Sequence, residues 1–118
     1  MSGTSSYQIS KAAQQDLISI GRYTQQTYGE LQRHHYLQLF AEAFTKLADN
    51  PYMGRDINHV YPNCRQWIVG MHIVIYCVTE KLTPRILRII HQNQQIAYSL
   101  LVFDNNDKPD EITNDWFH

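Results

Sequence analysis

The 118-residue chain lacks most features that would place it in a specialised class of protein. Its two cysteines are too few for a disulfide framework. Residues 1–6 have neither the basic region nor the apolar core of a signal peptide. The longest apolar stretch, residues 68–78, is far shorter than the ~18 residues that a membrane span needs. We therefore expect a soluble cytoplasmic protein with no membrane partner.

Charge of one sign is not in excess either. Ten Lys and Arg face 11 Asp and Glu, which gives a net charge of −1 and argues against a strongly basic nucleic-acid-binding domain. G-x-S-x-G, Walker and G-x-G-x-x-G motifs are missing from the sequence. The six histidines and two cysteines show no spacing typical of a metal site. We expect neither a metal nor a cofactor.

The first half of the chain has the period of two helices. Ser10 suits a helix N-cap and Gly29 a helix end, and a second helix from Glu30 to Asp49 stops before Pro51. Because Gly29 is almost the whole connection, the helices should form an antiparallel hairpin. The predicted buried faces comprise Ala13, Leu17, Ile20 and Thr24 in the first helix and Tyr36, Phe40, Ala43, Phe44 and Leu47 in the second.

The second half predicts strands. Residues 7–9 suit a short edge or first strand, and residues 50–63 suit a loop. Strands are expected at 64–69, 72–79 and 85–91, and their short connections make them antiparallel. Residues 94–102 suit either a short helix or an added strand. The expected fold is α+β, with the helical hairpin packed on a small antiparallel sheet.

A two-residue turn at residues 70–71 sets the register, because paired residue numbers must then sum to 141. Arg65 opposes Tyr76, and Cys64 opposes Cys77. Alternation separates two faces. One face is expected to be polar and open and carries Arg65, Trp67, Val74 and Tyr76; the other is expected to form the core and carries Ile68, Ile73, Ile75 and Cys77.

The polar face holds the candidate chemical site. Arg65, Trp67, Tyr76 and Arg88 can gather there, with His91 in the same strand as Arg88. A guanidinium binds phosphate, a ring stacks on a base, and a histidine transfers a proton near neutral pH. The alternative is that the arginines pair with acidic side chains of the tail or of a partner.

Charge is distributed unevenly along the chain. Residues 1–50 are neutral, residues 51–92 carry +3 and residues 93–118 carry −4. This acidic tail is either solvated or lies over the basic segment of its own or a neighbouring chain. Trp116 and Phe117 are unusual in a polar spacer, so we expect them to dock in cis, on a sister chain or on a partner protein.

Several segments between Tyr7 and His91 carry a family resemblance. They are Ala13-x-x-Asp16-Leu17-x-x-Ile20, Tyr23-Thr24 with Gly29, Leu47-Ala48-Asp49-Asn50-Pro51 followed by Gly54-Arg55, Pro62-x-x-Arg65, His72-Ile73-x-Ile75-Tyr76 and Arg85-Ile86-Leu87-Arg88-Ile89-Ile90-His91. In this order and spacing they resemble the ParE branch of the ParE/RelE toxin superfamily, the toxic halves of bacterial type II toxin–antitoxin pairs. The toxin domain would span residues 1–92, and residues 93–118 would be an acidic extension.

The resemblance implies a toxin that inhibits DNA gyrase by binding and not by catalysis. A ParD-like antitoxin would neutralise it, and DNA would be contacted only through the complex with the antitoxin. The related RelE branch instead cleaves mRNA on the ribosome, and its catalytic set would here be Arg65, Tyr76, Arg88 and His91. The few basic residues near the sheet favour the gyrase inhibitor, because cleavage needs more positive charge at the phosphate. A non-toxic module that only binds an antitoxin is a further alternative.

Candidate partner contacts follow from apolar and charged side chains. An antitoxin segment that folds on binding lays apolar side chains into a groove. The candidates are Ile18, Leu39, Arg65, Trp67, Arg88, Trp116 and Phe117. A homo-oligomer and a hetero-oligomer with the antitoxin are both compatible with these features.

Overall fold

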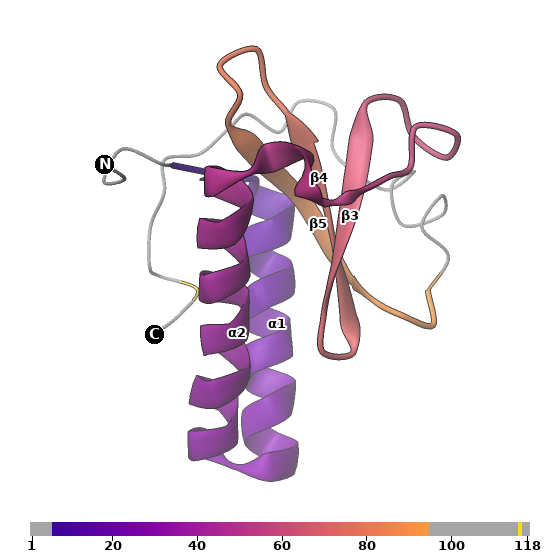
Figure 1. Ribbon diagram of the computed structural model, residues 1–118. Helices are drawn as coiled ribbons and strands as arrows, with labels where there is room; N and C mark the ends of the chain where they lie inside the picture. The colour runs from indigo at the N-terminus through magenta and orange to yellow at the C-terminus, as the bar shows by residue number, and fades with distance from the viewer. Residues whose placement is uncertain (1–5, 95–115, 117–118) are drawn as a thin grey trace.

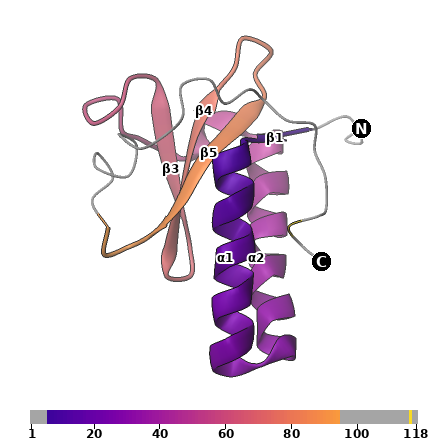
Figure 2. The same cartoon turned by 180° about the vertical axis from the view of Figure 1, so that it is seen from behind.

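The computed structural model describes residues 6–94 and Trp116. Two antiparallel helices pack against one face of a five-stranded sheet, and the tip of the hairpin projects beyond the turn between β3 and β4 (Figures 1 and 2). The elements are β1 (Gln8–Ile9), α1 (Lys11–Tyr28), α2 (Glu30–Asp49), the 3-10 turn η1 (Pro51–Met53), β2 (Arg55–Asp56), β3 (Cys64–Val69), β4 (His72–Val78) and β5 (Pro84–His91). The predicted α+β fold with a helical hairpin is confirmed.

The helix boundaries follow local capping chemistry. The Ser10 hydroxyl accepts a hydrogen bond from the backbone N–H of Ala13 at 3.0 Å and donates one to the carbonyl of Leu87 at 2.9 Å, so the cap also ties α1 to β5. Gly29 separates the helices with φ of 99°. The buried faces match the prediction with two differences: Ile20 and Tyr36 are half-buried, and Gly21 and Leu37 are buried beside them.

The sheet has the order β1-β5-β4-β3-β2 and is mixed. β1 pairs in parallel with β5, so the prediction of a purely antiparallel sheet is wrong. This pairing joins the two ends of the described domain, and no local sequence pattern fixes its direction. β2 lies inside the segment that was predicted to be a loop. The sequence does not indicate this strand, because two residues are too few to show the alternation of a strand.

The predicted register between β3 and β4 is confirmed. All six pairs have numbers that sum to 141, from Cys64 opposite Cys77 to Val69 opposite His72. Gly70 supplies the turn with φ of 58°, a backbone conformation that favours glycine. Both cysteines are free thiols, as expected from their small number.

The predicted assignment of the sheet faces is wrong. Val74 and Tyr76 face the helices and are fully buried in the main core. Ile73 and Ile75 lie on the other face, in a second cluster with Ile57, whereas Ile68 is 57% exposed. Both faces of β4 are covered, so no open polar face exists there, and hydrophobicity alone cannot show which face meets the helices.

No helix within residues 6–94 is long and apolar enough to cross a membrane. The predicted helix or strand at residues 94–102 falls, from residue 95 onward, outside the described residues. The same holds for the acidic extension apart from Asn93, Gln94 and Trp116.

Candidate functional site

Tyr76 is a structural residue of the core. Its hydroxyl donates a hydrogen bond to the carbonyl of Pro51 at 2.7 Å and accepts one from the N–H of Gly54 at 2.9 Å. Burial raises the pKa of this phenol above its ordinary value, although the contact with Gly54 and the charge of Arg65 oppose the shift. The ring is fully buried. The expected exposed ring for stacking on a base is therefore not present at this position.

Arg65 is bound to the backbone of η1 and the residue after it. Its Nη1 donates to the carbonyl of Gly54 at 2.7 Å and to that of Tyr52 at 3.2 Å. Its guanidinium carbon lies 5.0 Å from the centre of the Tyr52 ring, in cation–π geometry. The aromatic partner of Arg65 is thus Tyr52, which the sequence did not single out.

Arg88 forms an ion pair with α1. Its Nε and Nη2 donate to the two carboxylate oxygens of Asp16 at 2.8 and 3.0 Å, and the N–H of Ile89 donates to the same carboxylate at 2.9 Å. The hydrogen bond to Asp16 raises the pKa of the guanidinium, while burial opposes the shift. The carboxylate that holds Arg88 therefore belongs to α1. The sequence had instead suggested a carboxylate of the tail or of a partner protein.

His91 belongs to a different cluster. Its ring centre lies 5.3 Å from that of His72, whose Nδ1 is 2.7 Å from the hydroxyl of Tyr36. Burial, and then the neighbouring His91, lowers the pKa of His72 from 6.5 to about 4, so His72 is neutral at physiological pH. The His91 ring also accepts a hydrogen bond from the N–H of Asn93 at 3.2 Å through Nδ1.

The four residues of the predicted catalytic set do not converge. Arg65 and Tyr76 are paired near the start of β3, whereas His91 pairs with His72, which lies opposite the end of β3. The two pairs are therefore four residues, or about 13 Å, apart along β3. Arg88 is held by Asp16 of α1. The predicted gathering of these side chains on one open face is wrong, because that face carries the helical hairpin.

An apolar groove lies between the hairpin and the end of the sheet. We call it the hairpin groove, and it encloses 560 Å³ between side chains that are mainly apolar or aromatic. Three of them are largely exposed: Tyr23 at 63%, Tyr28 at 68% and Met71 at 57%. The groove is lined by Ser19, Ile20, Tyr23, Thr24, Tyr28, Gln32, Tyr36, Met71, His72 and His91. Sequence reasoning missed it, although Tyr23 and Tyr28 stand off the buried stripe of α1 and could have been read as exposed aromatics.

The predicted partner contacts are distributed over two other surfaces. Leu39, 45% exposed, and the half-buried Trp67 line a shallow depression beside the exposed Ile68. Ile18 is half-buried and lines a pocket on the helices together with Trp116. Trp116 is only 3% exposed and packs on its own chain. Phe117 lies outside the described residues.

Comparison with known proteins gives a consistent result. The family model described as the ParE toxin of the type II toxin–antitoxin system parDE matches residues 7–96. Toxin ParE1 of Mycobacterium tuberculosis is 32% identical over 97 residues, which cover 82% of this chain and 99% of that protein. Toxin ParE1 of Caulobacter vibrioides is 29% identical over 87 residues, covering 74% and 88%.

A solved structure supports the fold independently. A chain of the chromosomal ParDE toxin–antitoxin system from P. aeruginosa superposes with a TM-score of 0.64 at 19% identity, covering 73% of this chain and 94% of that one. The helical hairpin and the sheet are thus those of a known architecture. With the family model spanning most of the described residues, the chain belongs to the ParE toxin family of type II toxin–antitoxin systems.

Proposed function

We propose that this toxin acts in the cytoplasm by binding and inhibiting DNA gyrase, and that a ParD-like antitoxin neutralises it. Membership of the ParE family supports the proposal. The observation that carries the choice of binding over catalysis is the separation of Arg65, Tyr76, Arg88 and His91. Each of these residues has a structural partner, and the four side chains do not meet at one place.

RNA cleavage would need these groups together. A phosphate in the transition state requires cations and a proton donor within hydrogen-bond distance of the same few atoms. Here Arg65 contacts backbone carbonyls and Arg88 contacts Asp16, so both guanidinium groups already have acceptors. Using either for catalysis would break these contacts first. This arrangement favours a toxin whose effect comes from occupying a surface of its target.

The hairpin groove is our proposed binding site for the antitoxin. Exposed aromatic and methionine side chains around a mainly apolar groove suit a segment that folds on binding and inserts apolar side chains. Tyr and Met are also enriched at the centres of protein interfaces. The antitoxin of this proposal is an amphipathic segment, and its apolar face would cover Tyr23, Tyr28 and Met71.

The gyrase proposal is tested with the purified chain, freed from any antitoxin. We expect supercoiling by gyrase to fall as the chain is added, cleaved DNA to accumulate, and the antitoxin to restore activity. A folded chain that leaves supercoiling intact at excess concentration would contradict the proposal. Codon-spaced mRNA cuts on translating ribosomes would then favour the endonuclease, and normal growth on induction would favour the non-toxic module.

The antitoxin site is tested with a matched pair of variants. Met71→Glu places a charge in the groove, whereas Leu82→Glu places one on the β4–β5 turn at nearly the same exposure, 60% against 57%. Burying an unpaired carboxylate should weaken the affinity of the Met71→Glu variant for the antitoxin by about tenfold or more. The affinity of the Leu82→Glu variant should not change. Calorimetric titration measures both. Equal affinities for the two variants would place the antitoxin elsewhere.

A further inference from the structure

The two cysteines of the chain lie directly opposite each other on neighbouring strands. Cys64 begins β3 and pairs with Cys77 near the end of β4. Side chains that face each other across a pair of strands project from the same side of the sheet. Here that side carries the second apolar cluster, with Ile57, Ile73 and Ile75, and faces away from the helices. Cys64 is buried in this cluster and Cys77 is half-buried, and both are free thiols.

The backbone places this pair in the closest arrangement that an antiparallel ladder offers. The N–H of Cys64 donates to the carbonyl of Tyr61 at 3.2 Å, and its carbonyl accepts from the N–H of Ile57 at 3.0 Å, so both groups point away from β4. The pair that closes a two-residue turn is hydrogen-bonded and the two types alternate, so the sixth pair, Cys64 with Cys77, is not hydrogen-bonded. The Cα atoms of such a pair are about 4.5 Å apart, within the range of about 4.4–6.8 Å that a disulfide spans.

The two thiols differ in how readily they ionise. Burial, and then the neighbouring Cys77, raise the pKa of Cys64 from 9.0 to about 12. Burial also raises the pKa of Cys77, but the positive charge of Arg85, the residue opposite it in β5, counteracts that shift. Cys77 is also the more exposed of the two cysteines. Because the thiolate and not the thiol attacks an oxidant, Cys77 is the residue that reacts first.

We propose that Cys64 and Cys77 form a reversible disulfide across β3 and β4 when the folded chain meets hydrogen peroxide. The Cys77 thiolate attacks one oxygen of the peroxide, the O–O bond breaks, and the leaving hydroxide takes up the proton that the thiol released. Cys64 then attacks the sulfur of the resulting sulfenic acid, the S–O bond breaks, the S–S bond forms, and the leaving hydroxide takes the proton of Cys64. In sum, two thiols lose two electrons and two protons, and one peroxide becomes two water molecules.

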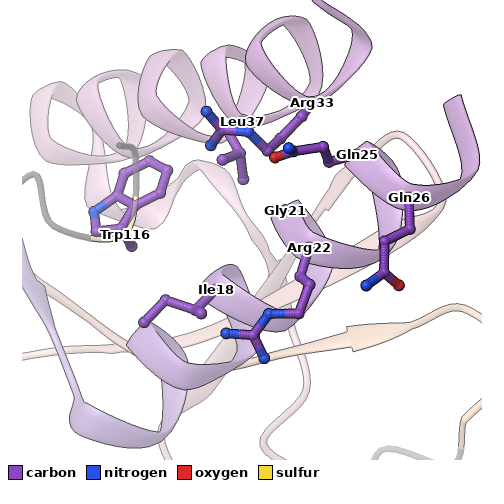
Figure 3. A pocket seen from close by; sticks show the side chains of 8 residues that line it. All are labelled: Ile18, Gly21, Arg22, Gln25, Gln26, Arg33, Leu37 and Trp116. Carbon is purple, nitrogen blue, oxygen red and sulfur yellow. The ribbon is translucent and has the colours of Figure 1, made fainter. Parts of the chain in front are cut away.

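The disulfide fastens β3 to β4 at the end of their pairing that is farthest from the turn. It closes a loop from residue 64 to residue 77, and a cross-link of this kind stabilises the fold mainly by restricting the unfolded chain. Neither cysteine lines the hairpin groove or the pocket between the helices that Figure 3 shows. Oxidation should therefore make the chain harder to unfold without changing either of these two sites.

The test uses the full chain, oxidised with hydrogen peroxide that is then removed. Titratable thiols should fall from the two of the reduced chain to none, a peptide map should join the peptides that contain Cys64 and Cys77, and dithiothreitol should restore both thiols. The melting temperature of the oxidised chain should exceed that of the same sample after dithiothreitol by about 5–15 °C. This comparison cancels any oxidation of methionine, because a thiol reagent reduces the disulfide and leaves the sulfoxides in place.

Cys77→Ser is the matched control, because it leaves Cys64 as the only cysteine and changes one atom of a half-buried side chain. Its melting temperature after peroxide should not respond to dithiothreitol. Three results would overturn the proposal. Two titratable thiols that persist after peroxide would show that the pair is not oxidised. Loss of thiols through sulfinic acids or through bonds between chains would show that the two sulfurs do not reach each other. Joined peptides that form only in urea would show that the folded backbone holds them apart.

Discussion

The variant Tyr76→Phe tests whether Tyr76 has a structural role in the core. The sequence had instead predicted a role for this ring in a nucleic-acid site. Tyr76→Phe keeps the ring and removes only the hydroxyl. The N–H of Gly54, which is buried, then loses its acceptor at 2.9 Å, and the carbonyl of Pro51 loses its donor at 2.7 Å. A ring that served to stack on a base would be almost unaffected by this change, whereas a ring that fastens η1 to the sheet would not.

The magnitude follows from the two lost hydrogen bonds. An unsatisfied buried donor costs about 1–3 kcal/mol, and the half-buried carbonyl of Pro51 can recover part of its loss from water. We expect the free energy of unfolding to fall by about 2–3 kcal/mol. For a domain of this size the melting temperature should fall by about 10 °C.

Urea unfolding followed by circular dichroism measures the change. Tyr52→Phe is the matched control, because Tyr52 is 55% exposed and its hydroxyl makes no hydrogen bond within residues 6–94; its effect should stay below about 0.5 kcal/mol. A loss of less than about 0.5 kcal/mol in Tyr76→Phe as well would refute the reasoning, since the hydroxyl would then contribute nothing to the fold.

Two further predictions concern titration and charge. Below pH 6.5 the unfolded chain protonates His72, whereas His72 of the folded chain stays neutral down to about pH 4. Protonation therefore favours the unfolded chain in this range. The free energy of unfolding should have its full value above pH 6.5 and fall by at most about 2 kcal/mol by about pH 5. Urea titrations of the wild type and of His72→Gln measure this loss, which should be smaller in the variant; equal losses would assign the pH dependence to other groups. Asp16→Asn removes the charge that faces Arg88 and should cost about 2–3 kcal/mol, because a largely buried guanidinium loses its counter-charge. An unchanged urea midpoint would show that the pair adds nothing.

Local patterns explain how much of the fold could be predicted. Leu17 in α1 and Phe40 in α2 each belong to a set of apolar residues that recurs on one side of its helix at the helical period. This spacing is what predicts the two helices. The register of β3 and β4 follows from a single turn at Gly70, because turn length fixes every pair after it. These elements depend on neighbours in the sequence, so the sequence could show them.

Contacts between distant segments could not be predicted in the same way. Asp16 and Arg88 are 72 residues apart, and nothing in either segment names the other. The face of β4 that meets the helices is set by how the hairpin packs, so Tyr76 was placed on an open surface although it is fully buried. The hairpin groove was missed for the same reason, since α1, α2 and the β3–β4 turn each supply part of it.

The central claim is that the toxin acts by binding its target, and the stoichiometry of gyrase inhibition tests it most directly. Purified chain is added to gyrase at fixed ratios, and supercoiling is followed over time. We predict inhibition that reaches its full extent near one chain per gyrase subunit and does not grow with longer incubation. Full loss of activity at a small fraction of that ratio, increasing with time, would show turnover and contradict the account.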